Sequence, residues 1–449
     1  MPYNALKIEY RKICDLKHYA NNPRVHNRAQ RRKLNSLLLK FGQVAPVIID
    51  PNGVIIDGHA VVEGLEALGF DEVATVTVTG HSREEIRALR LALNRIPQDA
   101  RWDQHNLRIE FQELIDLGFD MDLTAFDQVE IDMSLSFDEP ASGEIEDVPA
   151  APDLEGEAIS RLGDLWSLGN HRLICADARD VTALKSLFIS SVARMMFADP
   201  PYHIRIDKNV SGSGRTKHRE FEMFCGDEPE EEFNSFLLEF LDGTKTVMRD
   251  GGIGFICMDW RHIANLVFAG KEAGLGLKNI IVWVKTNAGM GAFYRSQHEL
   301  LAAFKWGDEP HLHNFELGKK GKSRSNVWTY AGMNSFGTER DELFAKHPTV
   351  KPLALVKDAI KDVSRRGDIV FDPFLGSGTT LIAAEETGRR CFGVELDPLY
   401  VDLSIRRWQD ATGKQAIHAA TGLTFDEMEV TRTSEVALLP PPSNQTEEG

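Results

Sequence analysis

The strongest chemical signal in the sequence is the tetrapeptide Asp199-Pro200-Pro201-Tyr202, which ends an apolar run that predicts a buried β-strand over residues 193–199. Consecutive prolines restrict φ and lack an N–H group, so the chain leaves the strand along one rigid path. The carboxylate of Asp199 and the carbonyl of Pro200 then remain as two acceptors beside the flat ring of Tyr202. This arrangement suits a planar base whose exocyclic amino group must be held and made nucleophilic. A turn with a structural aspartate is the alternative, and the full tetrapeptide disfavours it.

A second signal is a glycine-rich turn between two predicted strands, residues 369–372 and 390–397, with a predicted helix after the turn. Such a strand–turn–helix–strand unit binds an adenosine-containing ligand, because glycines let the backbone approach the ligand closely. A carboxylate at the end of the second strand, here Glu395, accepts hydrogen bonds from the ribose hydroxyls. The residues of the turn that we predict to contact the ligand are Phe374, Gly376, Ser377, Gly378 and Thr379.

Three classes of ligand site compete for this turn. A P-loop requires a lysine before the Ser/Thr, but Gly378 directly precedes Thr379. A dinucleotide-binding turn requires a third small residue where Leu381 stands. A methyl-donor site requires the pattern F-x-G-x-G, which Phe374, Gly376 and Gly378 supply. The sequence therefore favours a methyl-donor site, and its combination with the acidic tetrapeptide strengthens that interpretation.

The elements that must position these residues alternate between strand and helix. Residues 172–177 predict a strand that ends in an acid, residues 183–188 a helix, and residues 193–199 the next strand. The length of 449 residues predicts two or three domains with ample core, and no apolar run is long enough to span a membrane. Five scattered cysteines without a C-x-x-C pair predict reduced cytoplasmic thiols and neither a disulfide framework nor a metal site.

The net charge of −17 is unevenly distributed along the chain. Residues 1–45 hold ten Lys and Arg against two acidic residues, whereas residues 127–157 hold eleven acidic residues and no basic one. The second stretch shows no sustained period, so we predict an acidic linker over residues 131–157. Residues 425–449 have a similar composition and predict a disordered tail. The acidic total therefore does not exclude a nucleic-acid partner.

The segment before the linker, residues 1–130, predicts a small α+β module with a helical extension over 82–130. The PNG turn between residues 44–50 and 54–57 predicts a hairpin. Its other expected elements are a helix over residues 27–40, a helix that opens at Gly58-His59, a strand over 73–79, and helices over 82–96 and 104–117. The cluster Arg28, Arg31, Arg32 and Lys33 is either a stripe that faces phosphates or a plain solvated helix face.

Residues 42–78 resemble the N-terminal domain of ParB-like proteins, a fold shared with sulfiredoxin. Two departures limit what the resemblance implies. The phosphate-binding pattern places an arginine where Ala60 stands, and sulfiredoxin chemistry requires a cysteine where Gly58 stands. The resemblance therefore implies the fold and a DNA-associated role, without nucleotide hydrolysis or redox repair. For His59 we favour a buried or hydrogen-bonded histidine at a turn over a catalytic role.

Residues 160–412 resemble an amino-group DNA methyltransferase that uses S-adenosylmethionine. The target-base motif at 199–202 precedes the cofactor motif at 374–378, which is the circularly permuted order of the β group. The strings YRSQHELLAAFKWG (294–307), RSNVWTY (324–330), HPTVKPLALV (347–356) and GVELDPLYVDLSIRRW (393–408) also fit that group. The resemblance implies a class I, Rossmann-like α/β methyltransferase fold over residues 158–424, joined to the smaller ParB-like α+β domain.

The resemblance also implies roles for individual residues. Asp177 falls where the family contacts the cofactor adenine, although Ala176 replaces the usual glycine, and His203 stands where asparagine is common after the tetrapeptide. Lys351 and Asp372 are second-rank candidates for cofactor binding, and a structural role is as well supported for each. Aspartate in place of serine at the start of the tetrapeptide resembles the N6-adenine enzymes more than the N4-cytosine ones.

These inferences lead to a site-specific methyltransferase that acts on N6 of adenine in double-stranded DNA after flipping the base from the helix. The alternatives are an N4-cytosine enzyme and a ParB-like partition protein. We place target recognition within residues 203–230 and 260–345, where the basic loops 203–220 and 318–326 predict mainly phosphate contacts. The expected location is the cytoplasm, a homodimer is plausible, and the enzyme either accompanies a restriction enzyme or acts alone.

Overall fold

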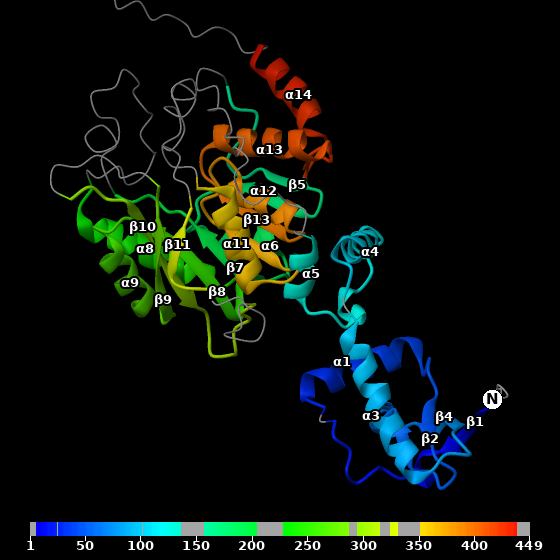
Figure 1. The fold of residues 1–449 in the computed structure, drawn as a ribbon. Helices are drawn as coiled ribbons and strands as arrows, with labels where there is room; N and C mark the ends of the chain where they lie inside the picture. The colour runs from blue at the N-terminus through cyan, green and yellow to red at the C-terminus, as the bar shows by residue number, and fades with distance from the viewer. Residues whose placement is uncertain are drawn as a thin grey trace, which may run out of the picture. The chain divides into compact units, whose positions relative to one another are not determined.

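The computed structural model describes residues 6–24, 26–100, 102–135, 157–203, 228–286, 294–314, 324–330 and 351–437. The chain divides into two compact units, Met1–Glu139 and Pro140–Gly449 (Figure 1). None of the helices within the described ranges is long and apolar enough to cross a membrane. Each unit has its own hydrophobic core and is considered by itself.

The N-terminal unit contains a four-stranded sheet with helices packed on it. The strands lie in the order β1 (Ile8–Lys12), β4 (Glu72–Thr77), β2 (Val47–Ile49) and β3 (Ile55–Asp57). A short 3-10 helix, η1 (Ile13–Asp15), and the α-helices α1 (Arg28–Phe41), α2 (His59–Ala67) and α3 (Arg83–Asp99) complete this layer. The predicted hairpin is present as the antiparallel pair of β2 and β3.

Local sequence signals explain where these helices begin. The side chain of Asn27 accepts the Gln30 N–H at 2.8 Å, which caps α1. Ser82 and Glu85 form a reciprocal capping box at the start of α3. Gly58 begins α2 at φ 97°, and a Cβ there would lie 3.1 Å from the side chain of Val47, so this position requires glycine.

The predicted structural role of His59 is confirmed. The side chain is buried at 7% exposure, and its Nε2 accepts the Tyr19 N–H at 3.3 Å. Burial lowers the pKa of His59, and the neighbouring His18 lowers it further, so the ring is held neutral as an acceptor. His59 therefore fixes the segment before α1 against α2.

A second, smaller cluster of helices follows α3. It consists of α4 (Gln104–Asp116), the 3-10 helix η2 (Met121–Thr124) and α5 (Gln128–Leu135), which pack around Leu107, Phe111 and Ile131. Lys33 of α1 donates to the Ala125 carbonyl at 2.8 Å and so joins this cluster to the first layer. Because α5 continues to Leu135, the expected linker over 131–157 is wrong for its first five residues, and residues 136–156 lie outside the described ranges.

The second unit is built on a ten-stranded sheet. Its order is β11 (Val327–Thr329), β9 (Gly276–Val284), β10 (His298–Lys305), β8 (Met248–Met258), β7 (Ala193–Ala198), β12 (Ile369–Asp372), β13 (Arg390–Glu395), β6 (His171–Cys175), β5 (Leu165–Leu168) and β14 (Ile417–His418). The strands from β8 to β6 are parallel, and β10 runs antiparallel between β8 and β9.

Helices cover both faces of this sheet, and each face has its own core (Figure 1). One face packs against α6 (Val181–Phe188), α8 (Glu230–Thr244) and α9 (Ile263–Glu272). The other packs against α11 (Leu353–Val363), α12 (Thr379–Glu386) and α13 (Pro398–Thr412). The predicted α/β fold is confirmed, and so is the permuted order, because β12 and β13 come late in the chain yet lie between β7 and β6.

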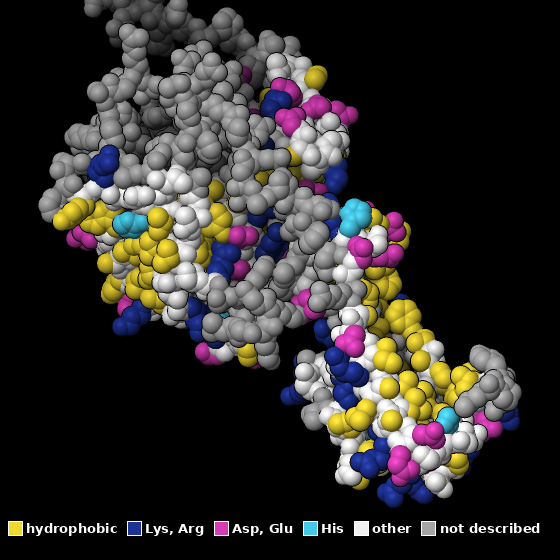
Figure 2. Space-filling view, in the orientation of Figure 1, with side chains coloured by type: hydrophobic (Ala, Val, Ile, Leu, Met, Phe, Trp, Pro, Cys, Tyr) yellow, Lys and Arg dark blue, Asp and Glu magenta, His cyan; other side chains and the backbone are white. Residues whose placement is uncertain are grey.

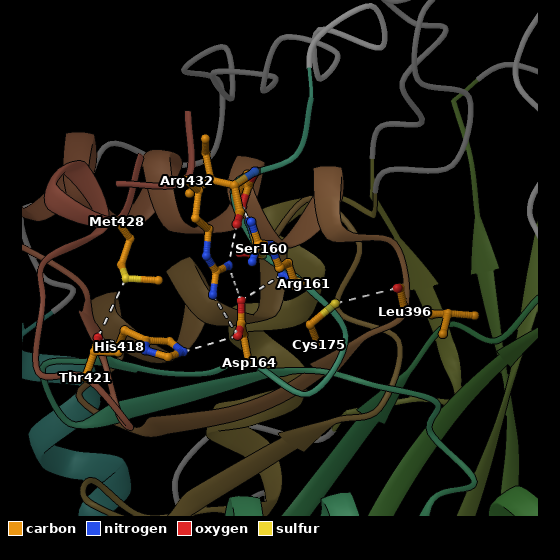
Figure 3. A network of polar contacts seen from close by, with 11 residues as sticks. Ser160, Arg161, Asp164, Cys175, Leu396, His418, Thr421, Met428 and Arg432 are labelled. Atoms are coloured by element: carbon orange, nitrogen blue, oxygen red, sulfur yellow. Dashed lines mark hydrogen bonds and ion pairs between the residues drawn. The ribbon is translucent and has the colours of Figure 1, made fainter. Parts of the chain in front are cut away.

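The predicted disordered tail is wrong for residues 425–437, which form helix α14 (Phe425–Ala437). Phe425 and Met428 are buried in the core, and Arg432 forms an ion pair with Asp164. Figure 3 shows this ion pair beside His418, whose Nε2 lies 3.2 Å from Asp164 Oδ1. Composition misled the prediction, because a few apolar residues and one buried ion pair are enough to dock a short helix. Residues 438–449 lie outside the described ranges.

Candidate active site

Four neighbouring parallel strands carry an acidic residue at or just after their carboxyl ends. In sheet order these are Asp199 after β7, Asp372 in β12, Glu395 in β13 and Asp177 after β6. The chain winds from β7 through α8 to β8 on one side, and from β12 through α12 to β13 on the other. Ligands of open α/β sheets bind where the winding reverses, so the edge beside β7 and β12 is the expected site.

Asp199 lies in a network of hydrogen bonds and ion pairs. Its Oδ1 accepts the Tyr202 hydroxyl at 2.7 Å, and its Oδ2 lies 2.6 Å from the ammonium of Lys351. Burial raises the pKa of Asp199, and the charge of Lys351 offsets part of this effect. Burial also raises the pKa of Tyr202 well above its usual value, so its hydroxyl remains a donor. The structure thus brings together the first and last residues of the tetrapeptide.

The prolines and the residue after the tetrapeptide direct the chain away from the sheet. Pro200 is buried, and Tyr202 packs against both cores of the unit. His203 adopts φ 55°, its ring stacks on Phe233 with centroids 4.9 Å apart, and its Nε2 lies 2.9 Å from the Glu228 carbonyl oxygen. The side chain of His203 is therefore committed to α8 and the segment before it. Residues 204–227, which include most of the predicted loop, lie outside the described ranges.

Lys351 connects Asp199 to a second carboxylate that sequence reasoning missed. Its ammonium lies 3.3 Å from Glu299 Oε2, and Glu299 also pairs with Lys285. Burial alone would raise the pKa of Glu299, but the two lysines lower it to about 2. Burial alone would lower the pKa of Lys351, but Asp199 and Glu299 raise it above its usual value. Both groups are therefore charged near neutral pH.

Glu395 is fixed next to the glycine turn by two backbone groups. Its Oε2 accepts the Gly376 N–H at 2.8 Å, and its Oε1 accepts the Asp397 N–H at 2.9 Å. Each oxygen retains a lone pair, as a carboxylate that accepts from two ribose hydroxyls requires. Burial raises the pKa of Glu395 to about 7, although these N–H groups oppose the rise.

Helix α13 holds the glycine turn from behind. The Ser404 hydroxyl donates to the Gly376 carbonyl at 2.8 Å, and Arg407 donates to the Ser377 carbonyl at 3.1 Å and to Thr379 Oγ1 at 3.3 Å. Gly378 has φ 83°, and a Cβ there would lie 2.9 Å from Ser404 Oγ. The turn therefore depends on this glycine for its backbone conformation and for its contact with α13.

Asp372 and Phe374 support the turn from below. Asp372 is 4% exposed, and its Oδ1 accepts the Phe374 N–H at 3.0 Å. Burial raises the pKa of Asp372 to about 7, partly offset by a hydrogen bond from Thr380. The ring of Phe374 meets Phe240 of α8 edge to face, with centroids 5.0 Å apart. These contacts favour the structural role that the sequence left open for Asp372.

Asp177 is bound by Arg179, a residue that sequence reasoning did not single out. Asp177 Oδ1 accepts the Arg179 N–H at 2.8 Å, and its Oδ2 lies 2.7 Å from Arg179 Nη2. Burial opposes ionisation of Asp177, but the hydrogen bonds from Arg179 prevail and lower its pKa. The Arg179 guanidinium also lies 5.6 Å from the ring centre of Phe236, which orients the pair. Asp177 is thus a fixed, charged acceptor at its strand end.

The predicted site residues therefore converge on one edge of the sheet, around the ends of β7, β12, β13 and β6. Glu299 and Lys285 belong to the same site but had no predicted role. Glu299 lies within the string 294–307 that resembles the methyltransferases, and this is the signal that could have identified it. Within the described ranges, no group of three or more His, Cys, Asp or Glu side chains is placed to hold a metal ion.

Together, a permuted, doubly wound sheet, a glycine turn beside a fixed carboxylate, and an Asp-Pro-Pro-Tyr motif on the adjacent strand define a class I amino-methyltransferase. Comparison with known proteins agrees. Residues 193–406 match the N6/N4 DNA methylase family, and residues 105–162 match the helix-turn-helix domain of ParB–methyltransferases. The second match covers most of α4 and all of α5. The sequence alone predicted this region only as a helical extension followed by an acidic linker.

Two curated relatives are Type II methyltransferases. M2.DpnII of Streptococcus pneumoniae is 30% identical over 225 residues, which cover 47% of this chain and 81% of that protein. M2.MboI of Moraxella bovis is 28% identical over 225 residues, with 49% and 81% covered. The solved complex of M1.HpyAVI with S-adenosylmethionine is 24% identical and covers 52% of this chain and 98% of that one, with a TM-score of 0.37.

The identity to M2.DpnII over most of that protein shows that this chain belongs to the N6/N4 DNA methylase family. It is a DNA methyltransferase whose methyl donor is S-adenosylmethionine, and it carries a ParB-like region before the catalytic unit. Both parts of the predicted combination are therefore confirmed. The roles of the individual site residues remain predictions.

Proposed function

We propose that this enzyme methylates the exocyclic N6 amino group of adenine in double-stranded DNA at a specific sequence. The observation that carries the proposal is the position of Asp199-Pro200-Pro201-Tyr202 at the end of β7, directly beside the β12 strand that leads into the glycine turn. An acceptor pair for an amino group and a site for the methyl donor then share one edge of the sheet. Aspartate at the first position favours adenine over cytosine.

The target nitrogen is stacked inside the duplex, so the enzyme must flip the nucleotide out at a cost of a few kcal/mol. Tyr202 then stacks on the extruded base, while the Asp199 carboxylate and the Pro200 carbonyl accept the two amino hydrogens. These hydrogen bonds draw the nitrogen lone pair out of conjugation and direct it toward the methyl donor. Alignment of the reacting atoms supplies most of the rate, because the donor already carries a good leaving group.

S-adenosylmethionine, when bound, supplies a methyl group on a positively charged sulfur. The residues present fit this cofactor, because Glu395 is a fixed acceptor for ribose hydroxyls and Asp177 is a fixed acceptor for the adenine amino group. Residues 374–380 would lie along the methionyl part. Arg407 of α13 binds the main-chain carbonyl of Ser377 and the side-chain hydroxyl of Thr379, so it fixes both residues of the turn from behind.

Binding of DNA is proposed to involve both units. Arg28, Arg31 and Arg32 of α1 are exposed at helical spacing and form a basic stripe, and Figure 2 shows Lys and Arg side chains on the visible face of the N-terminal unit. Such a stripe suits phosphate contacts, which position the protein on DNA and weaken with salt. The helix-turn-helix match at 105–162 supports the same role. Within the catalytic unit, residues 203–230 and 260–345 remain our proposal for target recognition.

The test of the adenine proposal is single-molecule sequencing of DNA from a host that expresses this chain. We expect N6-methyladenine at one sequence motif, and its absence in a host that expresses the Asp199→Ala variant. N4-methylcytosine at a motif would transfer the proposal to cytosine. If neither modified base is found although the protein is folded and binds the cofactor, the proposed function is refuted. A partition-like nucleotide hydrolase is disfavoured by Ala60 and by the buried, hydrogen-bonded His59.

Affinity for S-adenosylmethionine is expected to increase with pH. The pKa of Glu395 is raised to about 7 in the cofactor-free protein, and its ionised form is the better acceptor for ribose hydroxyls. If binding requires that form, the dissociation constant falls roughly tenfold between pH 6 and pH 8, because the ionised fraction rises about tenfold. Titration calorimetry at pH 6, 7 and 8 measures this change.

The matched control for this titration is Asp372, whose pKa is also raised to about 7. Glu395→Gln should weaken binding and remove the pH dependence, whereas Asp372→Asn should leave the pH dependence in place. If the pH dependence of cofactor binding instead disappears in Asp372→Asn and persists in Glu395→Gln, the titrating group is Asp372 and the prediction is wrong.

We propose cytoplasmic action, which fits a DNA substrate and the free thiols of Cys14, Cys175, Cys257 and Cys391. We also propose a homodimer, which analytical sedimentation tests. A cognate restriction enzyme is a further proposal, which the neighbouring genes test. We place the domain boundary between residues 136 and 156 and extend the catalytic unit to residue 437, because α14 docks on it.

A further inference from the structure

The charged network around Asp199 contains a second carboxylate, that of Glu299. Glu299 lies near the start of β10, opposite Trp283 near the end of β9. Lys285 follows β9 and pairs with Glu299 Oε1. Because Leu300 lies opposite Met258 at the end of β8, Glu299 reaches the same edge of the sheet as the target-base motif. A partly buried acid at this edge is costly unless it is paired, and two lysines pair it.

Both oxygens of Asp199 are occupied in this structure. Tyr202 donates to Oδ1 at 2.7 Å, and Lys351 binds Oδ2 at 2.6 Å. An incoming amino group competes for these acceptors with an ammonium and a hydroxyl. A neutral amino group is a weaker donor to a carboxylate than an ammonium, because the ammonium hydrogen bond also carries the attraction between two opposite charges. Asp199 can therefore bind the base only if Lys351 or the Tyr202 hydroxyl has another acceptor to which it can donate.

Glu299 is placed to be that partner. Its Oε2 lies 3.3 Å from Lys351 Nζ and 3.3 Å from the Tyr202 hydroxyl oxygen. One oxygen is thus within reach of both donors that occupy Asp199. Lys285 holds the other oxygen of Glu299, which keeps Oε2 directed toward them. Contacts of 3.3 Å are longer than those to Asp199, as expected of a secondary partner that can shorten.

The charges support the same interpretation. The side chain of Lys351 is 7% exposed, so water cannot take over from a lost carboxylate partner. Breaking its pair with Asp199 without a replacement would leave a buried ammonium, which is strongly unfavourable. With Glu299 present, Lys351 keeps a counter-ion whichever contact Asp199 makes. The positive charge of Lys285 balances the second carboxylate, so two acids and two bases form the cluster.

We propose that Glu299 is a positioning residue for methyl transfer: it accepts Lys351 and the Tyr202 hydroxyl when Asp199 turns to the amino group of the target base. Glu299 acts through these two side chains and does not touch the reacting atoms. The proposal rests on the assignment of Asp199 and Tyr202 to the target base. It identifies a residue for the step that admits the base, separate from binding of the cofactor.

The test is Glu299→Gln, which keeps the size of the side chain and removes its charge. Single-turnover transfer of a tritiated methyl group from S-adenosylmethionine to unmethylated genomic DNA gives the rate constant without knowledge of the recognition sequence. We expect the rate constant per cofactor-binding enzyme to fall at least tenfold, while the dissociation constant of S-adenosylmethionine changes less than threefold. Glu299→Asp, which retains the charge, should recover part of the rate.

The matched control is Glu385→Gln. Glu385 also accepts from several partners, namely His171, Trp408 and Lys414, but these contacts lie outside the active site. This variant should be less stable yet transfer methyl groups at the normal rate per cofactor-binding enzyme. It separates loss of a structural carboxylate from loss of one that positions the site.

A second variant covers the case in which Glu299→Gln does not fold. Lys285→Met removes the cation that orients Glu299, and the Lys285 side chain is 28% exposed, so folding should survive. We expect a smaller decrease of the same rate constant with unchanged cofactor affinity. A normal rate in Glu299→Gln, or in Lys285→Met where only that variant folds, overturns the inference. If Asp199→Ala is meanwhile inactive, the proposed function stands; if Asp199→Ala is active, the proposed function fails first.

Discussion

Replacement of Asp199 by alanine is expected to abolish methyl transfer and to leave binding of S-adenosylmethionine intact. The variant loses the carboxylate that accepts the target amino group, and loss of one such polar contact typically lowers rates by roughly 10²- to 10³-fold. Lys351 keeps Glu299 as a partner in this variant, so the fold should persist. Methyl incorporation into genomic DNA measures the loss of transfer, and calorimetry with S-adenosylmethionine measures whether cofactor binding is retained.

Two further variants define the contribution of Asp199. Asp199→Asn retains an acceptor oxygen but loses the ion pair with Lys351, so an intermediate rate is expected. Asp242→Ala serves as the control, because Asp242 lies exposed on α8 and pairs only at the surface with Lys245. Full activity of Asp199→Ala would show that the target base is held elsewhere.

Replacement of Arg432 by methionine should destabilise the catalytic unit by about 3 to 5 kcal/mol, the usual effect of removing one partner of a buried ion pair. The side chains of Arg432 and Asp164 are 10% and 12% exposed. Arg432 also donates to the Ile159 carbonyl, so it joins α14 to the segment before β5. Methionine preserves the apolar stem of the side chain and removes only the charged group.

Urea unfolding monitored by tryptophan fluorescence tests this expectation, because Trp166 is fully buried beside α14. The control is Arg406→Met at the same interface. Arg406 pairs with Glu429 of α14, but these side chains are 47% and 41% exposed, and such surface pairs contribute at most about 1 kcal/mol. Equal decreases in the free energy of unfolding of the two variants would mean that the buried ion pair stabilises the unit no more than the surface pair does.

The parts of the site predicted from sequence are those that local rules determine. The glycine turn and Glu395 lie in one continuous unit of strand, helix and strand, so their proximity follows from short connections. The prolines of the tetrapeptide likewise act within a few residues. Only the family resemblance suggested that Asp199 would lie beside this turn, because the two motifs are far apart in the sequence and meet through the pairing of β7 with β12.

The missed features depend on distant pairing or on composition. Lys351 lies 152 residues from Asp199, and no periodic pattern indicates that the two form an ion pair. Glu299 reaches the site because β10 runs antiparallel to its neighbours, which a strand pattern alone does not reveal. Helix α14 was missed because its acidic and hydroxyl-rich sequence resembles a solvated tail, while its docking depends on Phe425, Met428 and Arg432.

The position of β12 in the sheet has a consequence for synthesis of the enzyme on the ribosome. In the completed sheet β12 and β13 are the strands that connect β7 to β6, yet they are translated after all the strands from β5 to β11. Until they emerge, β7 and β6 have no strand between them, and each keeps an unpaired edge. The nascent chain can therefore form its N-terminal unit early, whereas the catalytic sheet closes late through distant contacts, which fold slowly. Premature termination within this region should consequently yield fragments with a folded N-terminal unit and no methyltransferase activity.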